Sequence, residues 1–152
     1  MDSMSAYDLR TTPPRRWNAQ IEGVIWLARL IDKARAHEAG TLGMYLYGQS
    51  PVDNSLLAAA RIDYAGLLDA VRAAPDDDGV LREIERRAPG ATQRLRAWSA
   101  KPPVTCRVTF AWNDVDEGYT RGPVARVIRT VSDGIYPVLT STLRKLFPLR
   151  TK

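Results

Sequence analysis

The stretch that decides the fold is Ile31-Asp32-Lys33-Ala34-Arg35-Ala36, followed by Gly40-Thr41-Leu42-Gly43-Met44-Tyr45-Leu46-Tyr47. If a helix starts near Asn18 and turns every 3.6 residues, one apolar arc faces the core. The members of this arc are Ile21, Val24, Ile25, Ala28 and Ile31. Asp32 and Arg35 fall within the same arc, so the helix carries charges toward the core. We expect the helix to end at Gly40, because glycine is favoured at a left-handed C-terminal position.

Asp32 and Arg35 need partners, since an ionised group that is buried alone is costly. They are neighbours at i and i+3, and we expect them to be buried and to pair with each other or with the loop from Gly40 to Tyr47. A structural ion pair is the more common use of such residues, and a functional site is the alternative. A second stripe is predicted to be solvated or to line a cleft. It consists of Glu22, Trp26, Arg29, Lys33 and His37.

Three short motifs resemble the signature of a bacterial domain-of-unknown-function family, number five-zero-six-nine. The motifs are Ile31 to Ala36, Ala39 to Tyr47, and Pro51 with Asp53, supported upstream by Tyr7 to Arg10. The resemblance covers roughly residues 7 to 100 and implies no reaction, cofactor or partner. Family members often carry a cysteine before the proline, where this chain has Ser50, which argues against a thiol-dependent or metal role for the loop here.

The composition predicts one mainly α-helical compact domain with at most a small two-stranded β element, because the chain has 152 residues of which 45% are apolar. Cys106 is the only cysteine and His37 the only histidine, so the sequence excludes an internal disulfide and a cysteine- or histidine-rich metal site. We therefore expect no metal and no cofactor. The region before Trp17 has no apolar signal core, and no run reaches the roughly 20 apolar residues of a membrane span. These features predict a cytoplasmic protein.

The chain divides into an extended N-terminal arm (1–17), a helical core with the signature (18–100) and a C-terminal appendage packed on the same domain (104–152). In the core, Asp53, Asp63 and Asp76 are predicted helix caps. The appendage opens with an alternating pattern that predicts a half-buried strand, pairing with residues 42–47 or with a second chain. The alternating apolar residues are Val104, Cys106, Val108, Phe110 and Trp112. Two basic amphipathic helices should follow, from Pro123 to Gly134 and from Pro137 onward.

The net charge of +5 is unevenly distributed, because residues 119–152 contain seven lysines and arginines against Asp133 alone. Any contact with nucleic acid or an anionic membrane should therefore involve this tail. The candidate residues are Arg121, Arg126, Arg129, Arg144 and Lys145. A homo-oligomer is a further possibility, since the predicted strand needs a partner.

The favoured function is non-catalytic binding of an anionic small molecule or a partner protein. The predicted binding residues are Arg29, Asp32, Lys33, Arg35, Tyr45 and Tyr47. The cations would receive a carboxylate or phosphate while Asp32 orients Arg35. One alternative is an enzyme with Asp32 as general acid or base, assisted by Tyr45 or Tyr47, and it requires Asp32 at the wall of a pocket. The other alternative is a membrane or nucleic-acid adaptor that acts through the basic tail.

Overall fold

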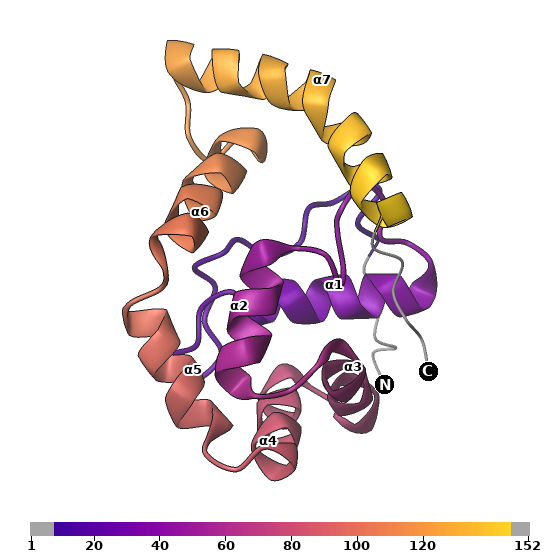
Figure 1. Ribbon diagram of the computed structural model, residues 1–152, viewed down its shortest axis with the longest axis vertical. Coiled ribbons are helices and arrows are strands. Elements are labelled where there is room, and N and C mark those ends of the chain that lie inside the picture. The colour runs from indigo at the N-terminus through magenta and orange to yellow at the C-terminus, as the bar shows by residue number, and fades with distance from the viewer. Residues whose placement is uncertain (1–7, 147–152) are drawn as a thin grey trace.

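The computed structural model describes residues 8–146, except for eight side chains in the last helix. Helices are the regular elements of the described residues, and they confirm the mainly α class. In chain order they are α1 (Leu27–Ala39), α2 (Pro51–Ala60), α3 (Tyr64–Ala73), α4 (Asp77–Arg87), α5 (Ala91–Ala100), α6 (Val104–Asp116) and α7 (Pro123–Leu146). Figure 1 shows α1 above α3 and α4, with α5 and α6 following one another along the left side and α7 arching over the top.

α1 begins at Leu27, nine residues after the start predicted near Asn18. The preceding residues form a tight turn in which Ile21 and Val24 exchange backbone hydrogen bonds of 3.1 and 2.9 Å. Gly23 lies in the turn with φ 83°, and Trp26 itself has φ 66°, so a helix cannot run through this segment. The prediction of the helix start was wrong because periodicity alone does not register a turn.

The other end of α1 is as predicted, at Gly40 with φ 68°. The next two residues close the helix in a Schellman-like arrangement, because the amide of Thr41 donates to the carbonyl of Ala36 at 2.8 Å. The predicted caps Asp63 and Asp76 are also confirmed, since each accepts a hydrogen bond from the amide three residues later, at 2.7 and 2.6 Å. The prediction for Asp53 was wrong: Ser50 is the N-cap residue of α2 and Asp53 is fully buried.

The hydrophobic core forms around α1. Its largest fully buried side chains come from the turn before α1, α1 itself and α2 to α5: Val24, Trp26, Leu27, Leu30, Ile31, Val52, Leu56, Leu67, Val80, Leu81, Ile84 and Leu95. α6 adds Phe110, whose ring stacks on Trp17 with centroids 4.8 Å apart and lies 5.2 Å from the ring of Trp26. The start of α6 therefore covers a side of the core that α1 to α5 leave open.

α6 occupies the segment predicted to be a strand, and the described residues contain no strand for it to pair with. Alternating residues in a helix fall into two stripes that lie about 160° apart, because positions two apart are rotated by about 200°. One stripe, with Cys106 and Phe110, is buried, whereas the other, with Val104, Val108 and Trp112, is exposed. The prediction of a strand was therefore wrong, because the alternating apolar residues form two stripes of a helix rather than one face of a strand. Residues 42–47 likewise form turns and bends.

α7 is one helix where two were predicted, because it continues through Gly134 and Pro137. It packs against α6, and in Figure 1 it arches from α6 over the top of the view toward the side on which α1 ends. One apolar stripe of α7 is largely exposed, at 45–71% of each side chain's surface. This stripe consists of Val124, Val127, Val131, Ile135 and Val138. We expected Val124, Val127, Ile128 and Val131 to face inward, and of these Ile128 alone is half-buried. The side chain of Arg144, and the residues after Leu146, lie outside the described part of the chain.

Candidate functional site

A cleft of about 240 Å³ lies between α1, the loop before α2 and the outer part of α6. Its walls are mainly apolar and aromatic, and its polar residues come from three different elements. The lining residues are Trp26, Arg29, Lys33, Tyr45, Leu46, Ser50, Pro51, Thr109, Trp112 and Asn113. Three of the predicted binding residues, Arg29, Lys33 and Tyr45, therefore meet in one concave site, as the cleft-lining alternative for the second stripe required.

Arg29 is almost fully buried in the cleft wall, with 3% of its surface exposed. Its guanidinium forms a two-pronged ion pair with Glu117, the residue that ends α6, and one of the two hydrogen bonds is 3.1 Å long. The same guanidinium lies 5.3 Å from the ring of Trp26 and 5.6 Å from the ring of Tyr45. Arg29 therefore ties α1 to the end of α6 and holds two aromatic walls of the cleft together.

Lys33 lies one turn further along α1 and is equally buried. Its ammonium group pairs with the carboxylate of Asp53, which also accepts a hydrogen bond of 2.7 Å from the indole nitrogen of Trp26. Burial lowers the pKa of Lys33, and the negative charge of Asp53 opposes this shift. The site thus contains a desolvated lysine that is paired with one buried carboxylate.

The charges of the cleft are arranged in two layers. The ten residues of its lining include two cations and no acid, whereas the carboxylates of Asp53 and Glu117 lie behind the cations. A ligand in the cleft would therefore meet hydrogen-bond donors first. This arrangement favours an acceptor or an anionic edge on a mainly apolar ligand.

Asp32 and Arg35 lie outside the cleft lining, and their ion pairs are with other residues rather than with each other. The carboxylate of Asp32 is buried and accepts hydrogen bonds of 2.9 to 3.2 Å from the backbone amide and the guanidinium of Arg15. Arg15 also pairs with Asp77, which in turn pairs with Arg35 at 2.9 Å. The expected pairing of Asp32 with Arg35 or with residues 40–47 was therefore wrong, because a segment 17 residues upstream supplies the partner.

The surroundings of Asp32 are relevant to the alternative function, an enzyme in which Asp32 is the general acid or base. Asp32 is 2% exposed and enclosed by Arg15 from the segment before α1. It lines none of the pockets described here. Such a geometry is typical of a structural ion pair.

Tyr47 is separated from the cleft and packs in the core. Its ring lies 4.8 Å from that of His37 and 5.2 Å from that of Tyr64, and its hydroxyl donates to the backbone carbonyl of Tyr64 at 3.3 Å. Burial raises the pKa of Tyr47, so this hydroxyl remains protonated at physiological pH. Tyr45 and Tyr47 thus lie in different environments despite their spacing of two.

The comparisons with known proteins identify the family. A family model described as "Domain of unknown function (DUF5069)" matches residues 11–130. The chain belongs to this family. The match covers the whole cleft and the ion pairs behind it, including Asp53 and Glu117. A search of curated proteins found no match.

In this DUF5069 member, sequence reasoning missed the residues that complete the site. Glu117, Thr109, Trp112 and Asn113 were not predicted as site residues, because residues 104–113 were assigned to a strand and residues 114–118 to an acidic turn. Asp53 is part of the family signature, but its acidic side chain close to a helix start was interpreted as a cap. A spacing of 20 residues between Lys33 and Asp53 gives no local signal of their contact.

Two further properties concern the whole described region. Residues 8–146 contain no group of three or more histidine, cysteine, aspartate or glutamate side chains that could hold a metal ion. No helix among these residues has the length and apolar character needed to cross a membrane.

Proposed function

We propose that the protein is a non-catalytic module that binds a small molecule with a flat apolar body and an anionic edge. The site is the cleft between α1 and α6, and the observation that carries the proposal is its lining: aromatic walls with two cations and no acid. The volume of about 240 Å³ is below the range of about 300–1,000 Å³ typical of drug-sized ligands, so the ligand is small.

The two cations are the anchors for the anionic edge. Arg29 and Lys33 are already paired, so an anion binds by accepting additional hydrogen bonds rather than by neutralising a free charge. An anion near Lys33 also favours its protonated form, which burial disfavours. The energetic gain is largest where water is excluded, and the buried positions of Arg29 and Lys33 meet this condition.

The test is a thermal-shift and calorimetric screen of small aromatic acids on the full chain, with each acid compared with its uncharged amide. Benzoate and indole-3-acetate, against benzamide and indole-3-acetamide, are suitable first pairs. Trp112→Ala should abolish stabilisation by an acid that the wild type binds. Val108→Ala is the matched control, because Val108 is exposed on the same helix and lies outside the cleft.

The proposal is refuted if no acid stabilises the wild type, or if Trp112→Ala binds as well as Val108→Ala. A partner protein that inserts a side chain into the cleft then becomes the favoured alternative. Mass spectrometry of the ligand after long incubation tests the non-catalytic character. A ligand recovered in altered form would show that the module is an enzyme.

A second candidate function rests on the exposed apolar stripe of α7. The stripe lies on one side of an amphipathic helix, and the exposed charges on this helix and in the preceding loop include Arg121, Arg126, Arg129 and Lys145, against Asp133. A second copy of the chain would bring the same positive charge, whereas an anionic lipid surface is complementary to it. We therefore infer contact between α7 and an anionic membrane surface.

Cosedimentation with phosphatidylglycerol vesicles tests this candidate. Val131→Asp places a charge in the stripe and should abolish binding. Thr130→Asp adds the same charge at an exposed position that is adjacent to Val131 but outside the stripe. This variant should retain most of the vesicle binding of the wild type. Equal binding of the two variants, or no binding of the wild type, would exclude the membrane surface as the partner of the stripe.

A further inference from the structure

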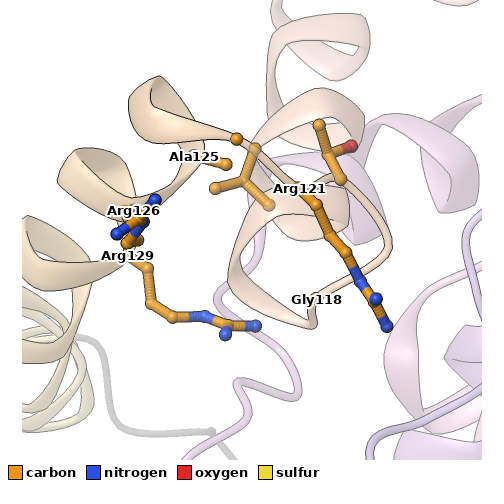
Figure 2. Close-up of a pocket in the computed structure, with 8 residues that line it drawn as sticks. Gly118, Arg121, Ala125, Arg126 and Arg129 are labelled. Carbon is orange, nitrogen blue, oxygen red and sulfur yellow. The ribbon is translucent and has the colours of Figure 1, made fainter.

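A second hollow, of about 510 Å³, lies between the end of α6 and the start of α7. It is separate from the cleft and shares no lining residue with it. Its lining consists of Val115, Gly118, Thr120, Arg121, Gly122, Ala125, Arg126 and Arg129, which are drawn in Figure 2. Three arginines and no acid line this space.

Two of the three arginines lack an acidic partner. Among the described residues, no hydrogen bond or ion pair links the side chain of Arg121 or Arg126 to a carboxylate, whereas Arg15, Arg16 and Arg29 are all paired. Arg129 is held by a neutral group, since it donates to the backbone carbonyl of Asp116 at 3.1 Å. The hollow therefore concentrates positive charge, and the carboxylate of Asp116 interacts electrostatically with Arg129 alone among its three arginines.

The loop that forms the hollow is shaped around Arg129. Gly118 has φ 82°, and a Cβ atom added there would lie 2.8 Å from a guanidinium nitrogen of Arg129. Gly122, directly before α7, has φ 144°, a value that other residues rarely adopt. In Figure 2 the side chain of Arg129 extends toward Gly118, and the guanidinium of Arg121 lies on the other side of Gly118. The lack of a side chain at Gly118 permits the approach of Arg129 to the loop.

We propose that this hollow binds the phosphoryl groups of a small diphosphate or polyphosphate ligand. Guanidinium groups bind phosphate oxygens in pairs, and three of them suit the several negative charges of a diphosphate. The hollow is also far larger than a single phosphate requires. The first amides of α7 add partial positive charge on the same side, which assists the arginines. This site is independent of the aromatic cleft, and either can exist without the other.

Isothermal titration calorimetry of sodium pyrophosphate on the full chain tests the proposal. Arg121→Gln and Arg126→Gln should each weaken binding roughly tenfold or more, the typical effect of losing a hydrogen bond between charged groups. Arg107→Gln is the matched control, because Arg107 is exposed on α6 outside the hollow and its replacement changes the net charge equally. This control should bind within about twofold of the wild type.

Gly118→Ala provides a second variant that alters geometry without altering charge. Its methyl group displaces Arg129, so pyrophosphate binding should weaken while the net charge stays at +5. Far-UV circular dichroism confirms that the variant remains folded. Unchanged affinity in Gly118→Ala would show that the position of Arg129 is not part of the site.

The source of the phosphoryl group is resolved in a second arm. In this arm, binding to vesicles with phosphatidic acid is compared between the wild type and Arg126→Gln. If the substitution weakens vesicle binding as much as pyrophosphate binding, the phosphoryl group belongs to a lipid headgroup, and the site is supported. A labelled oligonucleotide that binds more tightly than pyrophosphate with the same arginine dependence would overturn the small-ligand assignment. Absence of pyrophosphate binding by the wild type, or equal weakening in Arg107→Gln, would overturn the site altogether.

Discussion

Replacement of Lys33 by methionine should strongly destabilise the protein. The side chains of Lys33 and Asp53 are 4% and 0% exposed, so the change leaves a carboxylate in the core without its counterion. Removing one member of a buried pair typically costs about 3–5 kcal/mol. One oxygen of Asp53 keeps its hydrogen bond from Trp26, so we expect a loss near the lower end, about 3 kcal/mol.

The double variant Lys33→Met/Asp53→Asn should be less destabilised than Lys33→Met alone. It removes both charges from the core, and the desolvation penalty of an unpaired ion disappears with them. The asparagine side chain can still accept the hydrogen bond from Trp26. The coupling energy between the two positions should therefore reach about 2 kcal/mol or more.

The ion pair between Arg72 and Glu38 is the matched comparison, because it joins the same two charge types on the surface. The two side chains are 55% and 35% exposed. A solvent-exposed pair contributes only about 0–1 kcal/mol, so Arg72→Gln should change the free energy of unfolding by no more than this.

Urea denaturation at pH 7, followed by circular dichroism at 222 nm, measures the wild type and four variants, which include the single variant Asp53→Asn that the coupling energy requires. A domain of this size typically has about 5–15 kcal/mol of stability, so the variants should remain folded without denaturant. The reasoning is refuted if Lys33→Met costs no more than Arg72→Gln. If the destabilisation of the double variant equals the sum of the two single substitutions, the predicted coupling energy between Lys33 and Asp53 is refuted.

Three further predictions concern single residues. Gly40→Ala should lower the free energy of unfolding by about 1 kcal/mol, because φ at this position is 68° and no atom lies near the new methyl group; thermal denaturation measures it. The hydrogen bond from Arg16 lowers the pKa of Asp114, so this pair stabilises the fold above the ordinary aspartate pKa, and its contribution is lost as pH falls through the lowered value. Asp114→Asn should therefore cost up to about 1 kcal/mol at pH 7, and its difference from the wild type in urea denaturation should narrow toward pH 3. Because burial lowers the pKa of Lys33, this residue loses its positive charge at a pH below 10.5, the ordinary lysine pKa. The affinity of an aromatic acid for the cleft should therefore start to decline below pH 10.5 as the pH is raised. Calorimetry across a pH series measures this decline.

The parts of the fold that sequence analysis predicted correctly are those with local causes. Gly40 ends α1 because a left-handed residue is needed there, and Asp63 and Asp76 cap their helices through amides three residues away. These signals act within one turn of chain and need no tertiary context. The family signature also directed attention to α1 and the loop after it.

The parts that could not be predicted depend on contacts distant in the sequence. An alternating pattern fits a strand and a two-striped helix equally, and only the stacking of Phe110 on Trp17, 93 positions upstream, distinguishes them. The partners of Asp32 and Lys33 likewise come from residues 17 and 20 positions away. Periodicity correctly indicated that Asp32 would be buried, yet it cannot identify which element supplies the opposite charge.

The charged residues of α1 show how the fold and the cleft depend on each other. Each of them pairs with a different segment of the chain, and none pairs within the helix: Arg29 with Glu117, Asp32 with Arg15, Lys33 with Asp53, Arg35 with Asp77, and Glu38 with Arg72. A buried ion pair contributes little net stability, but it penalises every arrangement in which its partner is displaced. The pairs of Arg29, Asp32 and Lys33 therefore favour one placement of α2, the N-terminal segment and the end of α6 around α1. Because the two pairs nearest α2 and α6 also place the cations of the cleft, the residues that fix the packing are those that would receive the ligand.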